Sequence, residues 1–222
     1  MDPDSSRFDK FSREYIYGLN SNNPEKFFQN PDSHVLDLEK IKYKKILKIV
    51  EKMFIICNAT PFDYKNNTAK LISFLFTNKL DFISKGANSY RKTSPLQYSF
   101  FKEYREKALY LHSEIQCIKN SLKNKKYNSD IIGENGKWLM IVVRSKKNVW
   151  GNPIYGISFP CKGCRRALKT FNVKTVVYTL DQPEWEKNPV PRLGVLILKG
   201  DEYVNLDLTS WWSGQYSVGN SP

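Results

Sequence analysis

The sequence predicts an α/β protein, a three-layer α/β/α sandwich around a mixed sheet, with a polar N-terminal arm and a strand-rich C-terminal tail. Its central part alternates short apolar runs with stretches of helical periodicity, which is typical of helices packed on both faces of a sheet. A length of 222 residues suffices for one sizeable core, and 41% hydrophobic residues indicate a folded chain. We expect an arm over residues 1–36, a core over 37–182 and a tail over 183–222.

The first half of the core should contain three helices and a hairpin. Residues 37–58 carry apolar side chains at helical spacing, and a proline at position 61 follows them. The pair Asn78-Lys79 separates two apolar runs and predicts a β-hairpin. The expected elements are a helix 37–58, strands 70–77 and 80–84, a turn-rich basic loop 86–95, and helices 96–110 and 113–123.

The second half should supply the remaining strands. The expected elements are a polar loop 123–136, a strand 138–144, a basic loop 145–153, a strand 154–159, a helix 162–170, a strand 173–180, a loop 181–191, and strands 193–198 and 203–208. The loop 181–191 holds three prolines, so no helix fits there. Without a crossover helix, strand 193–198 should run antiparallel to strand 173–180.

The positive charge is concentrated in one part of the chain. The whole sequence has a formal net charge of +13. Residues 61–182 hold 22 Lys/Arg and 8 Asp/Glu, a net charge of +14, whereas both flanking segments are close to neutral. A Lys-rich coding bias would raise all segments alike. The distribution therefore favours an anionic substrate or partner for the central segment.

Two short motifs within this segment carry the chemistry. His112-Ser113-Glu114 opens one predicted helix, and Pro160-Cys161-Lys162-Gly163-Cys164 opens another. Imidazole and thiolate are preferred zinc ligands, and a catalytic zinc site uses three protein ligands and leaves one position for water. We therefore predict that His112, Cys161 and Cys164 bind zinc. A helix N-terminus would stabilise the thiolates of both cysteines.

Glu114 is the candidate catalytic residue, because it lies two positions after His112 and would reach the metal-bound water without binding the metal. Zinc lowers the pKa of such a water, and Glu114 would accept its proton. The motifs match the H-x-E…P-C-x-x-C signature of nucleobase deaminases, which implies that Glu114 protonates first the ring nitrogen and then the departing amine. Two other interpretations of the Cys-x-x-Cys pair are half of a structural zinc site and a redox pair. The chain lacks a second such pair and a thioredoxin-like pattern.

The other cysteines and the chain's apolar runs bear on its compartment. Cys57 and Cys117 lie among apolar residues, which predicts ordinary buried thiols. No apolar run approaches the length of a membrane span, and residues 1–9 are polar rather than signal-like. We expect a cytoplasmic, reducing compartment and no membrane partner.

Together the motifs resemble those of the zinc-dependent cytidine/deoxycytidylate deaminase superfamily, and most of all its small viral or phage nucleotide deaminases. The resemblance covers residues 70–181 and includes Gly86-Ala87-Asn88 and the strand 175–178. It implies a five-stranded sheet, two motifs at adjacent helix N-termini, and a hydrogen bond from Asn88 to the substrate's sugar or base. An alternative is that Asn88 is a turn residue. The family usually has alanine where Ser113 stands and a small or acidic residue where Phe159 stands, and residues 123–136 form an insertion.

The substrate implied by the resemblance is a cytosine nucleotide of the dCMP or CMP type, because the family associates an antiparallel last strand with free nucleosides and nucleotides. Candidate substrate-binding residues are Arg91, Lys92, Phe159, Arg165 and Arg166, besides Asn88. A second hypothesis is a cytidine or adenosine deaminase of single-stranded DNA or RNA, with Trp150, Tyr155 and Trp185 stacking on bases. A third is a non-catalytic interaction or particle-structural protein, with Trp211-Trp212 in a partner or homo-oligomer interface.

Overall fold

A computed structural model describes residues 40–60, 70–101, 110–124, 138–199 and 202–206 of the chain. The chain divides into two compact units, Met1–Tyr43 and Lys44–Pro222, and the account below concerns the second. The predicted arm 1–36, most of the loop 123–136 and the pair Trp211-Trp212 lie outside the described residues. No helix in the described ranges combines the length and the apolarity needed to cross a membrane.

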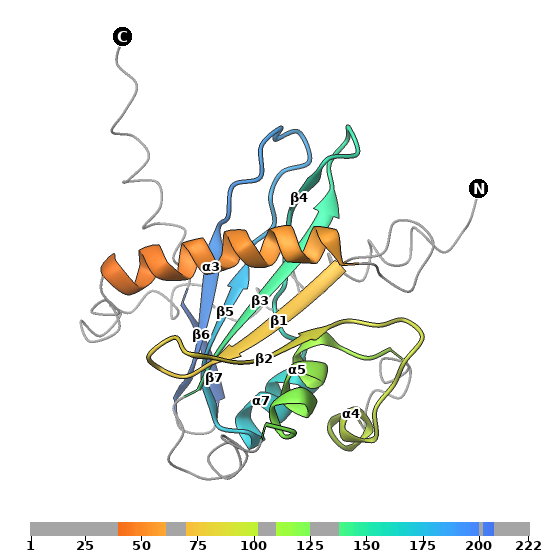
Figure 1. Cartoon of the computed structure of the whole chain (residues 1–222), viewed down its shortest axis with the longest axis vertical. Coiled ribbons are helices and arrows are strands. Elements are labelled where there is room, and N and C mark those ends of the chain that lie inside the picture. Colours follow the sequence, from red (N-terminus) through yellow and green to blue (C-terminus); the bar gives the residue numbers. More distant parts are fainter. Residues whose placement is uncertain (1–39, 61–69, 102–109, 125–137, 200–201, 207–222) are drawn as a thin grey trace, which may run out of the picture. The chain divides into compact units, whose positions relative to one another are not determined.

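The structure confirms an α/β protein with a mixed sheet (Figure 1). Its elements, in chain order, are α3 (Lys40–Ala59), β1 (Lys70–Phe76), β2 (Phe82–Ala87), α4 (Pro95–Phe100), α5 (Ser113–Ser121), β3 (Trp138–Lys147), β4 (Pro153–Gly156), α7 (Lys162–Thr170), β5 (Val173–Thr179), β6 (Leu193–Lys199) and β7 (Glu202–Leu206). The strand order is β2-β1-β3-β5-β6-β7, with β4 paired to β3. The β3–β5 pair is parallel, and the other pairs are antiparallel.

In the described part of the chain the sheet already has seven strands, two more than the resemblance implied. One added strand is β4, which forms a hairpin with β3. The other is β7, which pairs with β6, so the predicted tail contributes two strands to the same sheet. The expectation that strand 193–198 runs antiparallel to strand 173–180 is confirmed by the β5–β6 pairing.

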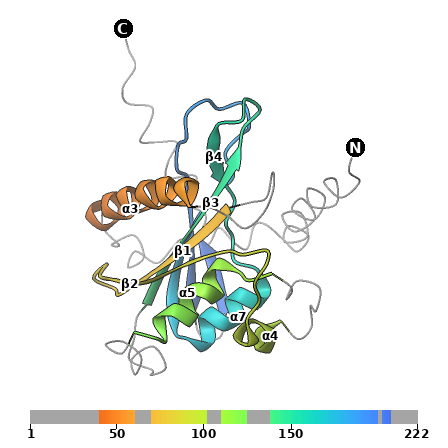
Figure 2. The same cartoon turned by 45° about the vertical axis from the view of Figure 1, so that its right-hand side comes forward.

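Strand β3 is buried on both faces, which explains its continuous apolar sequence. Its residues Trp138, Met140 and Val142 belong to the hydrophobic core that also contains residues of α5 and α7. The alternate residues face α3, because Ser145 Oγ donates a 2.7 Å hydrogen bond to Asn58 Oδ1 of that helix. Helices therefore cover both faces of the sheet, and Figure 2 shows α5 and α7 together, apart from α3.

The hairpin β1–β2 holds the start of α5 against the sheet. A Cβ atom on Gly86 of β2 would lie 2.3 Å from the backbone nitrogen of Cys117 and 2.4 Å from the carbonyl oxygen of Ser113. Glycine is therefore required at position 86 for this close approach between strand and helix. The Oγ atoms of Ser73 and Ser113 also lie 2.7 Å apart, which joins β1 to the first turn of α5.

Several predicted boundaries were wrong for identifiable reasons. The helix expected over 96–110 ends at Phe100, and Leu111 forms a β-bridge with Ser89 instead, while residues 102–109 lie outside the described part. Positions 86 and 87 belong to β2 and not to a loop. The expected loop 145–153 is shorter, because its first residues extend β3 and pair with β4.

Candidate metal centre

His112 is the residue immediately before the first turn of α5. Its backbone is extended, with φ −79° and ψ 146°, and its side chain emerges at the helix N-terminus. The His112 backbone N–H donates a 2.8 Å hydrogen bond to Oε1 of Gln97, a fully buried residue of α4. The side-chain amide of Gln97 also donates to the carbonyl oxygen of Tyr110. Gln97 thus fixes the chain on both sides of Leu111 and so orients His112.

Cys161 and Cys164 lie at the N-terminus of α7. Cys161 is the N-cap residue, and its Sγ accepts a 3.5 Å hydrogen bond from the backbone nitrogen of Cys164. Gly163 lies between them, and a Cβ atom there would come within 2.5 Å of the Phe101 ring. That ring packs edge-on against the His112 ring, with centroids 5.0 Å apart. The absence of a side chain at position 163 therefore leaves space for the Phe101 ring, which packs against the His112 ring beside the two cysteines.

The three predicted ligands converge as expected. His112 Nδ1 lies 3.7 Å from Cys161 Sγ and 3.5 Å from Cys164 Sγ, and all three ligand atoms lie within 4.8 Å of one another. In a tetrahedral zinc site with bonds of about 2.0–2.3 Å, ligand atoms lie roughly 3.6 Å apart. Both the donor set and the spacing fit a metal ion, so the cluster His112, Cys161 and Cys164 could hold one.

The two thiols of the cluster differ in acidity. Hydrogen bonding from Cys164 and His112 holds the pKa of Cys161 well below its usual value. Burial raises the pKa of Cys164, and the neighbouring Cys161 raises it further. Cys161 is therefore the first of the two to become a thiolate. Among the described cysteines, the predicted buried thiols Cys57 and Cys117 are confirmed as buried.

Glu114 lies beside this cluster, because it interacts with both Cys161 and Cys164, and it is almost completely buried, with 3% of its surface exposed. Its Oε2 atom accepts a 3.0 Å hydrogen bond from Ser113 Oγ, whose other neighbour is Ser73. Burial raises the pKa of the Glu114 carboxyl, and the charge of His112 opposes this rise. A buried carboxyl held through one oxygen can use the other to exchange protons with a neighbouring group.

Three predicted substrate-binding residues lie after β2. The side-chain oxygen of Asn88 accepts a 2.8 Å hydrogen bond from the backbone N–H of Leu71, and the Asn88 N–H donates to the Leu71 carbonyl oxygen at 3.1 Å. Asn88 therefore pairs with the start of β1 at the open end of the hairpin, and its role in substrate binding stays a prediction. Arg91 and Lys92 are exposed. Their role in substrate binding stays a prediction.

The predicted residues after β4 form a small group at α7. The guanidinium of Arg165 donates a 2.9 Å hydrogen bond to the Pro160 carbonyl oxygen and stacks over the Phe159 ring at 5.1 Å. Phe159 also contacts Tyr178 edge-to-face, with centroids 5.1 Å apart. Phe159 and Arg165 thus support the segment that leads into Cys161, and Arg166 is half-buried on the same helix.

The aromatic residues proposed for base stacking do not form one surface. Tyr155 is buried, and its ring packs on Phe54 of α3 with centroids 4.1 Å apart, so its predicted role in stacking was wrong. Its position in β4 faces α3 instead of the metal centre. Trp150 and Trp185 are exposed, at 54% and 74% of their surface. They belong to the tip of the β3–β4 hairpin and to the loop after β5.

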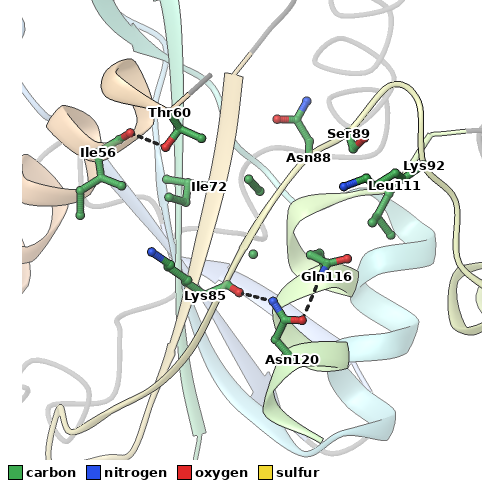
Figure 3. Close-up of a pocket in the computed structure, with 12 residues that line it drawn as sticks. Ile56, Thr60, Ile72, Lys85, Asn88, Ser89, Lys92, Leu111, Gln116 and Asn120 are labelled. Atoms are coloured by element: carbon green, nitrogen blue, oxygen red, sulfur yellow. Dashed lines mark hydrogen bonds between the residues drawn. The ribbon is translucent and has the colours of Figure 1, made fainter. Parts of the chain in front are cut away.

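A pocket of about 360 Å³ lies at the β2 edge of the sheet (Figure 3). Its lining includes Asn88 and Lys92, together with Lys85 of β2 and Asn120 of α5. Asn120 donates a 2.8 Å hydrogen bond to the Lys85 carbonyl oxygen across one wall. The three ligand residues and Glu114 are not among the described residues that line this pocket, so we do not identify it with the metal centre.

Sequence reasoning missed two residues near the cluster. Gln97 could have been found from the sequence, because its polar side chain interrupts the apolar face of the predicted helix. Arg144 could have been found in the same way, because it is a charged residue at the end of the apolar run of β3, on the face that carries Met140 and Val142. Its Nε is buried and has no hydrogen-bond partner among the described residues.

Comparison with known proteins does not assign the chain to a family. No protein-family model matches the sequence, and no curated protein matches it.

Proposed function

We propose that this protein is a zinc-dependent hydrolytic deaminase that converts a cytosine nucleotide, of the dCMP or CMP type, to its uracil form with release of ammonia. The observation that carries this proposal is the meeting of His112, Cys161 and Cys164 beside the buried carboxyl of Glu114. A purely structural metal site has no need of a buried carboxyl that is not a ligand. The cytidine deaminase-like fold is part of the same proposal, supported by two motif helices on one face of a mixed sheet.

The metal in this proposal is zinc, held by His112, Cys161 and Cys164. When bound, zinc supplies a water molecule whose pKa is low enough for attack on a ring carbon at neutral pH. Glu114 would accept one proton from that water at its carboxylate and give it to the ring nitrogen next to the carbon under attack. It would then take the second proton from the hydroxyl group now on that carbon and give it to the amino group, so that the carbon–nitrogen bond breaks and ammonia leaves. Ser113 holds Oε2 of Glu114 during these transfers.

The nucleic-acid deaminase hypothesis retains one supporting observation. Trp150 and Trp185 are exposed, and Lys187 lies over the Trp150 ring at 6.0 Å. Exposed aromatic rings beside cations can stack on unpaired bases. The burial of Tyr155 removes the third member of the predicted set. We therefore favour the free nucleotide.

The decisive experiment measures ammonia release by the zinc-loaded protein with dCMP, cytidine and single-stranded DNA as substrates. We expect turnover of dCMP, and a loss of about 100- to 10,000-fold in Glu114→Gln, which removes proton transfer while preserving the shape of the side chain. The Glu114→Gln variant should still bind one zinc ion, because Glu114 is not a ligand. Zinc binding without turnover of any of the three substrates would favour the non-catalytic hypothesis.

A further inference from the structure

Arg144 lies where the sheet splits at the carboxyl end of β3. On one side of β3, residues 138–142 pair with β5, and residues 144–147 pair with β4. Arg144 follows the end of the β5 pairing, and its backbone N–H donates a 3.2 Å hydrogen bond to Oγ1 of Thr179, the last residue of β5. In open α/β sheets, ligands commonly bind outside the carboxyl ends of the strands, which is where Arg144 lies on β3.

The side chain of Arg144 leaves β3 on the face that carries the metal centre. Strand alternation puts Arg144 on the same face as Met140 and Val142, which share the core with Cys164. Its stem passes over Gly156 of β4. A Cβ atom at Gly156 would lie 3.1 Å from Arg144 Cδ and 3.3 Å from Nε, so a glycine leaves room for the arginine.

The guanidinium of Arg144 has unused donors. Nη1 donates a 3.3 Å hydrogen bond to the carbonyl oxygen of Ile157, whereas Nε is buried without a partner in the described part of the chain. No ion pair links Arg144 to a carboxylate of the described residues. A half-buried guanidinium without a counter-ion is costly, and its planar set of N–H groups matches a phosphate or carboxylate.

The neighbours of Arg144 connect it to the metal ligands. Tyr90 lies close to Arg144. Burial raises the pKa of Tyr90, and the positive charge of Arg144 opposes this rise. The Tyr90 ring contacts the Tyr110 ring, with centroids 5.3 Å apart, and Tyr110 is two residues before His112. Ile157, the acceptor of Nη1, is four residues before Cys161. Arg144 is therefore linked to the chain before Cys161 directly, through Ile157, and to the chain before His112 indirectly, through Tyr90.

We propose that Arg144 binds the 5′-phosphate of the nucleotide substrate. This inference rests on the proposed function and adds a specificity-determining residue to it. The phosphate would accept hydrogen bonds from the Nη N–H groups of the guanidinium that do not bind Ile157. A nucleoside without a phosphate would leave those donors unpaired, so Arg144 would select nucleotides over nucleosides.

The test compares the binding of dUMP and deoxyuridine by calorimetry, with zinc-loaded wild type, Arg144→Met and Arg144→Lys. We expect Arg144→Met to raise the Kd of dUMP about 10- to 100-fold and to change the Kd of deoxyuridine less than about threefold. Arg144→Lys keeps the charge without the planar fork, so its Kd for dUMP should be intermediate. Arg192→Met is the matched control, since Arg192 pairs with Glu186 in the loop before β6.

Equal weakening of dUMP and deoxyuridine would overturn the proposal, because it would mean that Arg144 only positions the Ile157 segment. An unchanged Kd for dUMP would overturn it as well.

A second experiment separates this inference from the proposed function. It measures the shift in melting temperature that inorganic phosphate causes, compared with chloride at equal ionic strength. Suppose that phosphate raises the melting temperature of the wild type but not of Arg144→Met, and that the protein deaminates none of the substrates. This result would support the anion site and reject the proposed deaminase activity. Deamination of dCMP and deoxycytidine with equal losses in Arg144→Met would support the deaminase and reject the anion site.

Discussion

The backbone N–H of His112 donates its hydrogen bond to the side chain of Gln97, and not to another backbone group. Gln97 lies in the short helix α4 and is fully buried. Its second hydrogen bond, to the Tyr110 carbonyl oxygen, leaves its amide with a fixed orientation. The position of the metal ligand therefore depends on a residue 15 positions earlier in the chain.

Gln97→Met should weaken metal binding without removing a ligand. The substitution preserves side-chain length but leaves the His112 N–H buried and unpaired, at a cost of about 1–3 kcal/mol in the free energy of unfolding. Loss of a group that orients a ligand typically lowers metal affinity about 10- to 100-fold. Competition with a chromophoric chelator measures the zinc affinity, and denaturant unfolding measures the stability.

A matched control for Gln97 is Gln116→Met on α5, where the lost hydrogen bond runs to the side chain of Asn120. This variant should keep the wild-type zinc affinity, because the Gln116 side chain bonds away from the ligand and only its backbone N–H reaches the His112 carbonyl oxygen. A Gln97→Met protein that binds zinc as tightly as the wild type would show that Gln97 does not orient the ligand.

Metal removal should change which cysteines react with a thiol reagent. In the zinc-loaded protein we expect all four thiols to react slowly, because two are metal ligands and Cys57 and Cys117 are buried. A chelator should expose Cys161 first, since its pKa is lowered, and Cys164 afterwards. Counting reactive thiols with time measures this order. The first thiol to react after metal removal should be absent in Cys161→Ser and present in Cys57→Ala. A fast-reacting thiol that persists in Cys161→Ser would show that Cys161 is not the first cysteine to react.

Alkaline pH should destabilise the fold partly through its buried thiols. Burial raises the pKa of Cys57 and Cys117 from 9.0 to about 12. In the unfolded chain these thiols lose their protons above pH 9, whereas in the folded protein they keep them. Their contribution to stability is therefore fully present below pH 9 and is lost as the pH rises towards 12. The loss is at most about 1.4 kcal/mol per pH unit for each thiol.

Cys117→Ala isolates this contribution. Between about pH 8 and pH 10 the variant should lose about 1 kcal/mol less free energy of unfolding than the wild type does, although it is less stable at both values. Denaturant unfolding at the two pH values measures the difference. If the wild type and the variant lose the same amount, the Cys117 thiol does not carry the raised pKa.

Local pattern predicted most of the elements near the site. The helix after Cys161 has the predicted bounds, because a proline and an N-capping cysteine mark its start and Asn172, with a left-handed φ of 56°, follows its end. The end of α4 could not be predicted in the same way. Residues 96–110 show a helical pattern, but α4 ends at Phe100, and the bridge between Leu111 and Ser89 depends on a residue 22 positions earlier in the chain.

The two motifs are enough to identify the candidate ligands, but not their surroundings. Three ligand side chains at the starts of two helices suffice to predict a metal site. The orienting role of Gln97 and the guanidinium environment of Arg144 depend on contacts between residues far apart in the sequence, which periodicity does not reveal. The burial of Tyr155 was missed for the same reason, since its partner Phe54 lies in α3.

Local sequence patterns were enough to predict the α/β class, the order of strands and helices around the motifs, and the identity of His112, Cys161, Cys164 and Glu114 as one candidate site. These features follow from local spacing and from the chemistry of the side chains. Contacts between distant segments were needed to show that β4 and β5 share one side of β3, that the sheet splits at Arg144, and that Asn88 pairs with Leu71 at the start of β1. Strand pairing and close packing bring distant residues together, and no local pattern encodes which buried donors those contacts satisfy.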